Sequence, residues 1–133
     1  MSKIAITYGD FDCFNIDHSF LIKEMRKIVM PDNKLVVIIP DDYPVFFQKE
    51  YFPVQDINHR MKNLSFLVND IRVCLSNDPS SLMFEIISNL KKQGDKVIYV
   101  GYDDNKDFPG KESVVKHKIP IRFIKKYGQT KNN

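Results

Sequence analysis

The feature that most constrains this chain is a short polar segment between an apolar run and an amphipathic one. Residues 4–7 (Ile-Ala-Ile-Thr) predict a buried β-strand, and apolar residues recur at helical spacing over residues 20–28. Residues 8–18 therefore form a strand-to-helix connection, with Gly9 near its start and His18 at the helix entrance. Parallel sheets bind ligands outside the carboxyl ends of their strands, and a helix N-terminus attracts anions. The segment is thus the expected site for an anionic ligand.

Strand and helix patterns alternate along the rest of the chain, which indicates an α/β domain. Further strands are predicted at residues 34–39, 71–75, 96–100 and 121–124, and further helices at 56–68 and 79–92. A chain of 133 residues is too short for two domains. We predict one three-layer, Rossmann-like domain over residues 1–133. Its sheet is expected to be five-stranded and mainly parallel, in the order 3-2-1-4-5.

Local signals refine this prediction. Asp56 is an expected helix N-cap, and residues 77–79 (Asn-Asp-Pro) predict another N-cap followed by proline at the first helical position. Residues 41–55 contain two prolines and five aromatic residues, and predict a long, lid-like loop. Its aromatic side chains either pack on the core or on a partner subunit, or stack on a ligand. A polar loop is expected from the end of the fourth strand to about Lys118.

Composition excludes several classes of protein. With 43% hydrophobic and 28% charged residues, the chain is typical of soluble globular proteins. No apolar run reaches the ~18 residues of a membrane span, and no signal peptide is evident. The net charge of +3 comes from scattered residues, so no nucleic-acid footprint is predicted. Cys13 and Cys74 are expected to be reduced core residues, and the location to be cytoplasmic.

Residues 8–18 resemble the signature of the cytidylyltransferase-like nucleotidyltransferases, which read Gly-Thr-Phe-Asp and then His-x-Gly-His. Within this family, the segment resembles the small glycerol-3-phosphate cytidylyltransferases. The matching positions are Gly9, Phe11, Asp12, Phe14, Ile16 and His18. Two positions depart from the pattern, because Asn15 replaces the first histidine and Asp17 replaces the glycine.

The resemblance implies a transferase that joins a nucleoside monophosphate, from CTP or another nucleoside triphosphate, to a small phosphorylated alcohol and releases pyrophosphate. It also implies Mg²⁺ held mainly by the nucleotide phosphates, and a homodimer. No metal site made by protein side chains is predicted, and neither nucleic acid nor membrane is an expected partner. The alternative is a degenerate relative that acts as a nucleotide-binding or interaction module.

The resemblance assigns catalytic roles to four residues. A ring N–H of His18 would reach an α-phosphate oxygen, whereas Asn15 can donate a hydrogen bond but cannot carry a positive charge. Lys49 and Arg60 resemble the family's lysine-bearing loop and arginine-bearing helix, and would contact phosphates. Each of these cations, and His18 itself, is otherwise an ordinary surface residue.

Other positions would bind the nucleotide. The resemblance places Gly9, Asp10, Phe11, Asp17, Gly101, Asp103 and Thr130 there. A glycine in place of Asp17 would allow a nucleotide close to the backbone, and the carboxylate repels phosphates. Asp17 is alternatively the N-cap of the first helix. Residues 125–130 only weakly resemble the family's final motif, and its usual last helix is expected to be missing.

Overall fold

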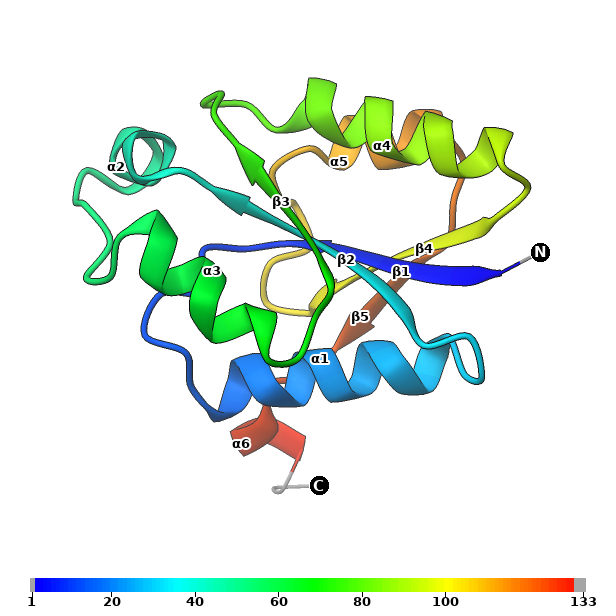
Figure 1. Ribbon diagram of the computed structural model, residues 1–133, viewed down its shortest axis with the longest axis horizontal. Coiled ribbons are helices and arrows are strands. Elements are labelled where there is room, and N and C mark those ends of the chain that lie inside the picture. Colours follow the sequence, from blue (N-terminus) through cyan, green and yellow to red (C-terminus); the bar gives the residue numbers. More distant parts are fainter. Residues whose placement is uncertain (1, 131–133) are drawn as a thin grey trace.

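The computed structural model describes residues 2–130 and contains a five-stranded parallel sheet (Figure 1). The strands are β1 (Lys3–Tyr8), β2 (Lys34–Pro40), β3 (Asp70–Cys74), β4 (Lys96–Tyr102) and β5 (Ile121–Ile124). Their order is β3-β2-β1-β4-β5, and each neighbouring pair is parallel. The predicted sheet, including its order, is confirmed.

Helices cover both faces of this sheet, as Figure 1 shows. They are α1 (Ile16–Ile28), α2 (Asp42–Lys49), α3 (Ile57–Ser65), α4 (Ser80–Lys92), α5 (Lys111–Lys116) and α6 (Tyr127–Thr130). The helices α4 and α5 lie on one face, and α1 and α3 lie on the other. This arrangement confirms the three layers.

The core is divided into two clusters by the alternation of side chains along each strand. Ile4 and Ile6 of β1 pack in the cluster beneath α4, together with Met83 of that helix. Ala5, between them, packs in the opposite cluster with Met25 of α1. Because both faces of the central strands are covered, these strands are continuously apolar.

The segment predicted as a lid-like loop contains a helix, α2, and this prediction is wrong. Asp41 is the N-cap of α2, and its carboxylate accepts a hydrogen bond from the Asp42 N–H at 2.8 Å. Pro44 lies in the first turn, where backbone N–H groups have no partner within the helix. Proline therefore does not interrupt α2, because at this position it removes no hydrogen bond of the helix.

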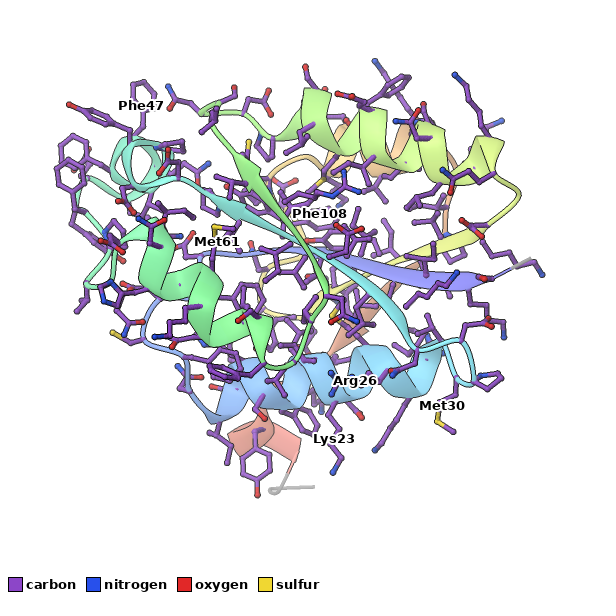
Figure 2. All side chains as sticks on the ribbon, in the orientation of Figure 1. Lys23, Arg26, Met30, Phe47, Met61 and Phe108 are labelled. Carbon is purple, nitrogen blue, oxygen red and sulfur yellow. The ribbon has the colours of Figure 1, made fainter. Side chains whose placement is uncertain are left out.

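The aromatic residues of this segment lie mostly at the surface. Phe46 and Phe52 stack with ring centroids 4.6 Å apart, and Tyr43 meets Phe52 edge-on at 5.7 Å. Phe47 is 69% exposed, and Figure 2 shows it at the outer edge of the molecule. The rings thus form a surface group and do not anchor the segment in the core of this chain.

Several other local expectations are corrected. The N-cap of α4 is Pro79 itself, whereas proline was expected at the first helical position, and the carboxylate of Asp78 accepts the Ser80 N–H at 2.9 Å. The helix α5 lies within the predicted polar loop, and the short helix α6 spans Tyr127–Thr130. Asp56 does cap α3, as predicted.

The two thiols also differ from expectation. Both are free, but Cys13 is exposed and only Cys74 is buried in the core. Within residues 2–130, no helix is long and apolar enough to cross a membrane. The cytoplasmic location and the homodimer stay predictions.

Candidate active site

A cavity of about 290 Å³ lies at the carboxyl ends of β1 and β4. The order of the strands reverses between these two, which is where open α/β sheets bind ligands. The lining comes from the strand ends, the loop after β1, α1, α2 and the segment after β4. It consists of Thr7, Tyr8, Gly9, Asp10, Phe11, Asp12, His18, Leu21, Gln48, Lys49, Tyr99, Gly101, Tyr102, Asn105, Phe108 and Pro109.

The loop after β1 is held in one shape by backbone and side-chain contacts. The Gly9 N–H donates to the Ile38 carbonyl at 3.1 Å. A Cβ atom at Gly9 would lie 3.1 Å from the Phe11 ring, so the position favours glycine. Phe11 is buried and has a left-handed backbone, with φ of 51°. The Asp12 carboxylate accepts hydrogen bonds from two backbone N–H groups between α2 and α3, at 2.7 and 2.9 Å.

Asn15 and His18 cap the N-terminus of α1. The Asn15 side-chain oxygen accepts the N–H groups of Asp17, at 3.0 Å, and His18, at 3.2 Å. In return, Nδ1 of His18 accepts the Asn15 N–H at 3.1 Å. The N-cap is therefore Asn15 and not Asp17, and Asn15 does not line the cavity.

This cap determines the chemistry of His18. Since Nδ1 accepts a hydrogen bond, the proton of the neutral ring is assigned to Nε2. Burial lowers the pKa of His18, and the carboxylates of Asp17, Asp10 and Asp12 offset only part of that effect. At neutral pH, His18 is therefore an uncharged hydrogen-bond donor in the cavity lining.

Lys49 lines the cavity, and its ammonium group pairs with the Asp10 carboxylate. The Lys49 side chain is 44% exposed and that of Asp10 is 13% exposed. Burial lowers the pKa of Lys49, but its hydrogen bond and charge interaction with Asp10 outweigh that effect and raise the pKa. Lys49 is therefore a full positive charge at neutral pH.

Arg60 does not line the cavity, and its side chain is fully buried. Its Nε donates to the Gln55 carbonyl at 3.1 Å, and Nη1 donates to the carbonyls of Asp10 (3.1 Å) and Pro40 (2.8 Å). Nη2 pairs with the Asp42 carboxylate at 2.7 Å. The structure thus gives Arg60 a role in holding the loop after β1, where the sequence predicted a phosphate clamp.

Asp17 also lies outside the cavity lining. Its carboxylate accepts the Tyr127 N–H at 2.9 Å, and its carbonyl accepts the Tyr102 hydroxyl at 2.7 Å. Asp17 therefore connects α1 with β4 and α6. Burial, with the Asp17 and Asp104 charges, raises the pKa of Tyr102, which keeps its hydroxyl protonated as a donor.

The remaining predicted positions differ in whether they line the cavity. Gly101 lines the cavity, and a Cβ atom there would lie 3.1 Å from the Tyr99 ring. Asp103 is absent from the lining, and its N–H donates to the Ile124 carbonyl at 2.9 Å. Thr130 is the last residue of α6, and its side chain lies outside the described part of the chain.

Sequence reasoning missed several lining residues. The Tyr8 hydroxyl accepts a hydrogen bond from Gln48 at 3.2 Å, and burial raises the pKa of Tyr8 to about 12. Tyr99 and Phe108 stack with centroids 3.9 Å apart, and Figure 2 shows Phe108 in the interior. Tyr8 could have been found from its position at the end of β1, beside Gly9, and Tyr99 from its place two residues before Gly101 in β4. Phe108 gave no signal, because it lies in a segment without periodicity.

Carboxylates suited to a metal ion are few here. Among residues 2–130, no group of three or more His, Cys, Asp or Glu side chains could hold one. Asp10 and Asp12 are the acidic residues of the cavity lining. This fits Mg²⁺, which is commonly held by one or two carboxylates together with substrate phosphates.

Comparisons with known proteins agree with this architecture. The solved structure of a lipopolysaccharide core biosynthesis protein from Thermoplasma volcanium GSS1 is similar to this one, with a TM-score of 0.67 and 22% sequence identity. The matched region covers 96% of this chain and 99% of that protein. A putative nicotinate-nucleotide adenylyltransferase from Vibrio parahaemolyticus has 14% identity and a TM-score of 0.50, covering 98% and 78%. Such similarity shows the shared fold.

The family assignment comes from the sequence itself. No significant match was found among curated proteins. A sequence model of the family described as cytidylyltransferase-like, however, matches residues 6–128, which is most of the chain. The protein therefore belongs to the cytidylyltransferase-like family of nucleotidyltransferases.

Proposed function

We propose that the protein transfers a nucleoside monophosphate from a nucleoside triphosphate, with CTP as the proposed donor, to a small phosphorylated alcohol. The observation that carries this proposal is that His18 of α1 and Lys49 of α2 line the same cavity, at the reversal of strand order. One neutral donor and one cation beside a helix N-terminus suit a polyphosphate. The phosphorylated alcohol as acceptor and cytosine as the nucleobase of the donor are proposed because the chain resembles the family.

In the proposed reaction, an oxygen of the acceptor phosphate attacks the α-phosphorus. The new bond joins that oxygen to phosphorus, while the bond from the α-phosphorus to the bridging oxygen breaks and pyrophosphate leaves with the electron pair. No covalent enzyme intermediate is needed, so the protein acts by positioning and by stabilising charge on the phosphate oxygens.

His18 and Lys49 would have different roles in this reaction. Nε2–H of His18 would donate to an α-phosphate oxygen, and the ring would keep its orientation through the hydrogen bond at Nδ1. Lys49 would neutralise charge on the departing phosphates. Arg60 would act indirectly, because its hydrogen bond to the Asp10 carbonyl fixes the loop that carries the site.

Mg²⁺ is the proposed cofactor. When bound, it would neutralise phosphate charge and polarise phosphate oxygens. Asp10 is the carboxylate that would serve as a protein ligand, since both oxygens of Asp12 already accept backbone hydrogen bonds.

A second candidate function is a module that binds nucleotide without transferring it. The position of Asn15 favours it, because its side chain caps α1 and does not line the cavity. Arg60 is likewise committed to internal partners. Losing one preorganised donor costs on the order of a hundredfold in rate, so two losses could silence the chemistry.

A pyrophosphate-release screen separates the two candidates. The four nucleoside triphosphates are tested against a panel of phosphorylated alcohols with Mg²⁺, using the parent, His18→Gln and Lys49→Met. Lys62→Met is the matched control, since Lys62 is an exposed lysine of α3. Circular dichroism confirms that each variant is folded.

We expect turnover by the parent and by Lys62→Met, and a loss on the order of a hundredfold in each site variant. An inert parent that binds nucleotide would favour the second candidate. Activity appearing only after Asn15→His with Asp17→Gly would establish that the departures from the family motif caused the loss.

A further inference from the structure

The cation of the cavity already has an anionic partner. Lys49 pairs with the carboxylate of Asp10, which stands where the family motif has threonine. A phosphate that binds Lys49 must therefore compete with Asp10. The short side chain of Asp10 is mostly covered, whereas the long side chain of Lys49 is nearly half exposed. Lys49 therefore has more conformational freedom than Asp10.

The charges of the lining do not favour a free polyanion. The described lining residues include two carboxylates, Asp10 and Asp12, and a single lysine, Lys49. His18 adds no charge at neutral pH, because burial lowers its pKa. A polyphosphate that entered alone would displace one carboxylate from Lys49 and then lie beside two of them, which is electrostatically unfavourable.

The two carboxylates are not equivalent. Asp12 is fixed by hydrogen bonds from the Val54 and Gln55 N–H groups. The backbone of Asp10 is fixed by Arg60, but its carboxylate is held by the ammonium of a flexible side chain. Asp10 is therefore the carboxylate that can exchange its partner while the loop stays in place.

We infer that Asp10 makes phosphate binding depend on a divalent cation. Asp10 holds Lys49 in the place of a phosphate until a cation arrives with the polyphosphate and takes the carboxylate as a ligand. The exchange then replaces one ion pair with two favourable contacts, namely Lys49 to phosphate and Asp10 to the cation. Free polyphosphate is rejected and its Mg²⁺ complex is accepted. This inference rests on the proposed function and names Asp10 as its specificity-determining residue.

Isothermal titration calorimetry tests this inference with two probes, CTP and inorganic triphosphate, each with excess Mg²⁺ and with EDTA. The proteins are the parent, Asp10→Asn and Asp10→Thr. Asp70→Asn is the matched control, because Asp70 also pairs with a basic residue, Arg72, and does not line this cavity. Thermal unfolding verifies that each variant is folded.

We expect the parent to bind both probes at least roughly tenfold more tightly with Mg²⁺ than with EDTA. In both Asp10 variants, binding with EDTA should strengthen by roughly five- to tenfold, so that the effect of Mg²⁺ largely disappears. Asp70→Asn should behave as the parent does.

Other outcomes separate the two claims. A parent that binds equally well with EDTA, or Asp10 variants that retain the parent's dependence on Mg²⁺, would overturn the inference and leave the proposed function standing. Absence of binding by the parent and by all variants under both conditions would overturn both.

Discussion

Replacing Arg60 with methionine should destabilise the protein strongly, although the residue was expected to bind substrate. Methionine retains most of the buried apolar stem and removes the guanidinium. Three backbone carbonyls, those of Gln55, Asp10 and Pro40, then lose a donor. The Asp42 carboxylate also loses its partner but is 31% exposed, so water can replace it. The Pro40 hydrogen bond is buried and the other two are partly buried, so at about 1 kcal/mol or more for each the loss is about 3–5 kcal/mol.

Urea unfolding followed by far-ultraviolet circular dichroism measures this loss. Lys62→Met on the same helix is the control, and its exposed position predicts a change of about 0.5 kcal/mol or less. Arg60→Lys should also be destabilising, because one ammonium cannot reproduce the planar fork of donors. A loss below about 1 kcal/mol in Arg60→Met would refute the structural role and return Arg60 to the candidate ligand-binding residues.

Two further predictions concern His18 in α1 and the contact of Tyr102 with α1. Burial lowers the pKa of His18 in the folded protein from its usual 6.5. As the pH falls, His18 is therefore protonated in the unfolded chain before it is protonated in the folded protein, and the free energy of unfolding should decrease below pH 6.5. Urea midpoints at about pH 7.5 and about pH 5.5 should therefore differ less in His18→Gln than in the parent, and an equal difference would contradict the lowered pKa. Tyr102→Phe removes the donor to the Asp17 carbonyl and should cost about 1 kcal/mol in the same assay, whereas an unchanged midpoint would mean that the hydroxyl contributes nothing to stability.

The sheet was predictable from the sequence because its strands are continuous apolar runs separated by segments of helical periodicity. The strand order followed from right-handed crossovers, with no knowledge of side-chain contacts. Short elements were harder to predict. The helix α5 spans only Lys111–Lys116, too few residues for a periodic pattern, and Pro44 concealed the first turn of α2.

The part of the candidate site that consists of residues close together in the sequence could be predicted. Gly9 and His18 of the motif at residues 8–18, and Lys49 from a later segment, line the same cavity. Asn15 at an N-cap position, followed by His18 at the third helical position, is a capping pattern that the sequence contains. The burial of Arg60 depends on carbonyls far away in sequence, and no local pattern encodes them.

The difference between the two thiols has a practical consequence for spectroscopy. Cys13 is exposed in the loop between Asp12 and α1, whereas Cys74 is buried and burial raises the pKa of its thiol. A thiol-reactive fluorophore or spin label should therefore attach at Cys13 without any engineered cysteine. Since Asp12, next to it, ties this loop to the segment between α2 and α3, such a label would report movement of the loop when a ligand enters the cavity.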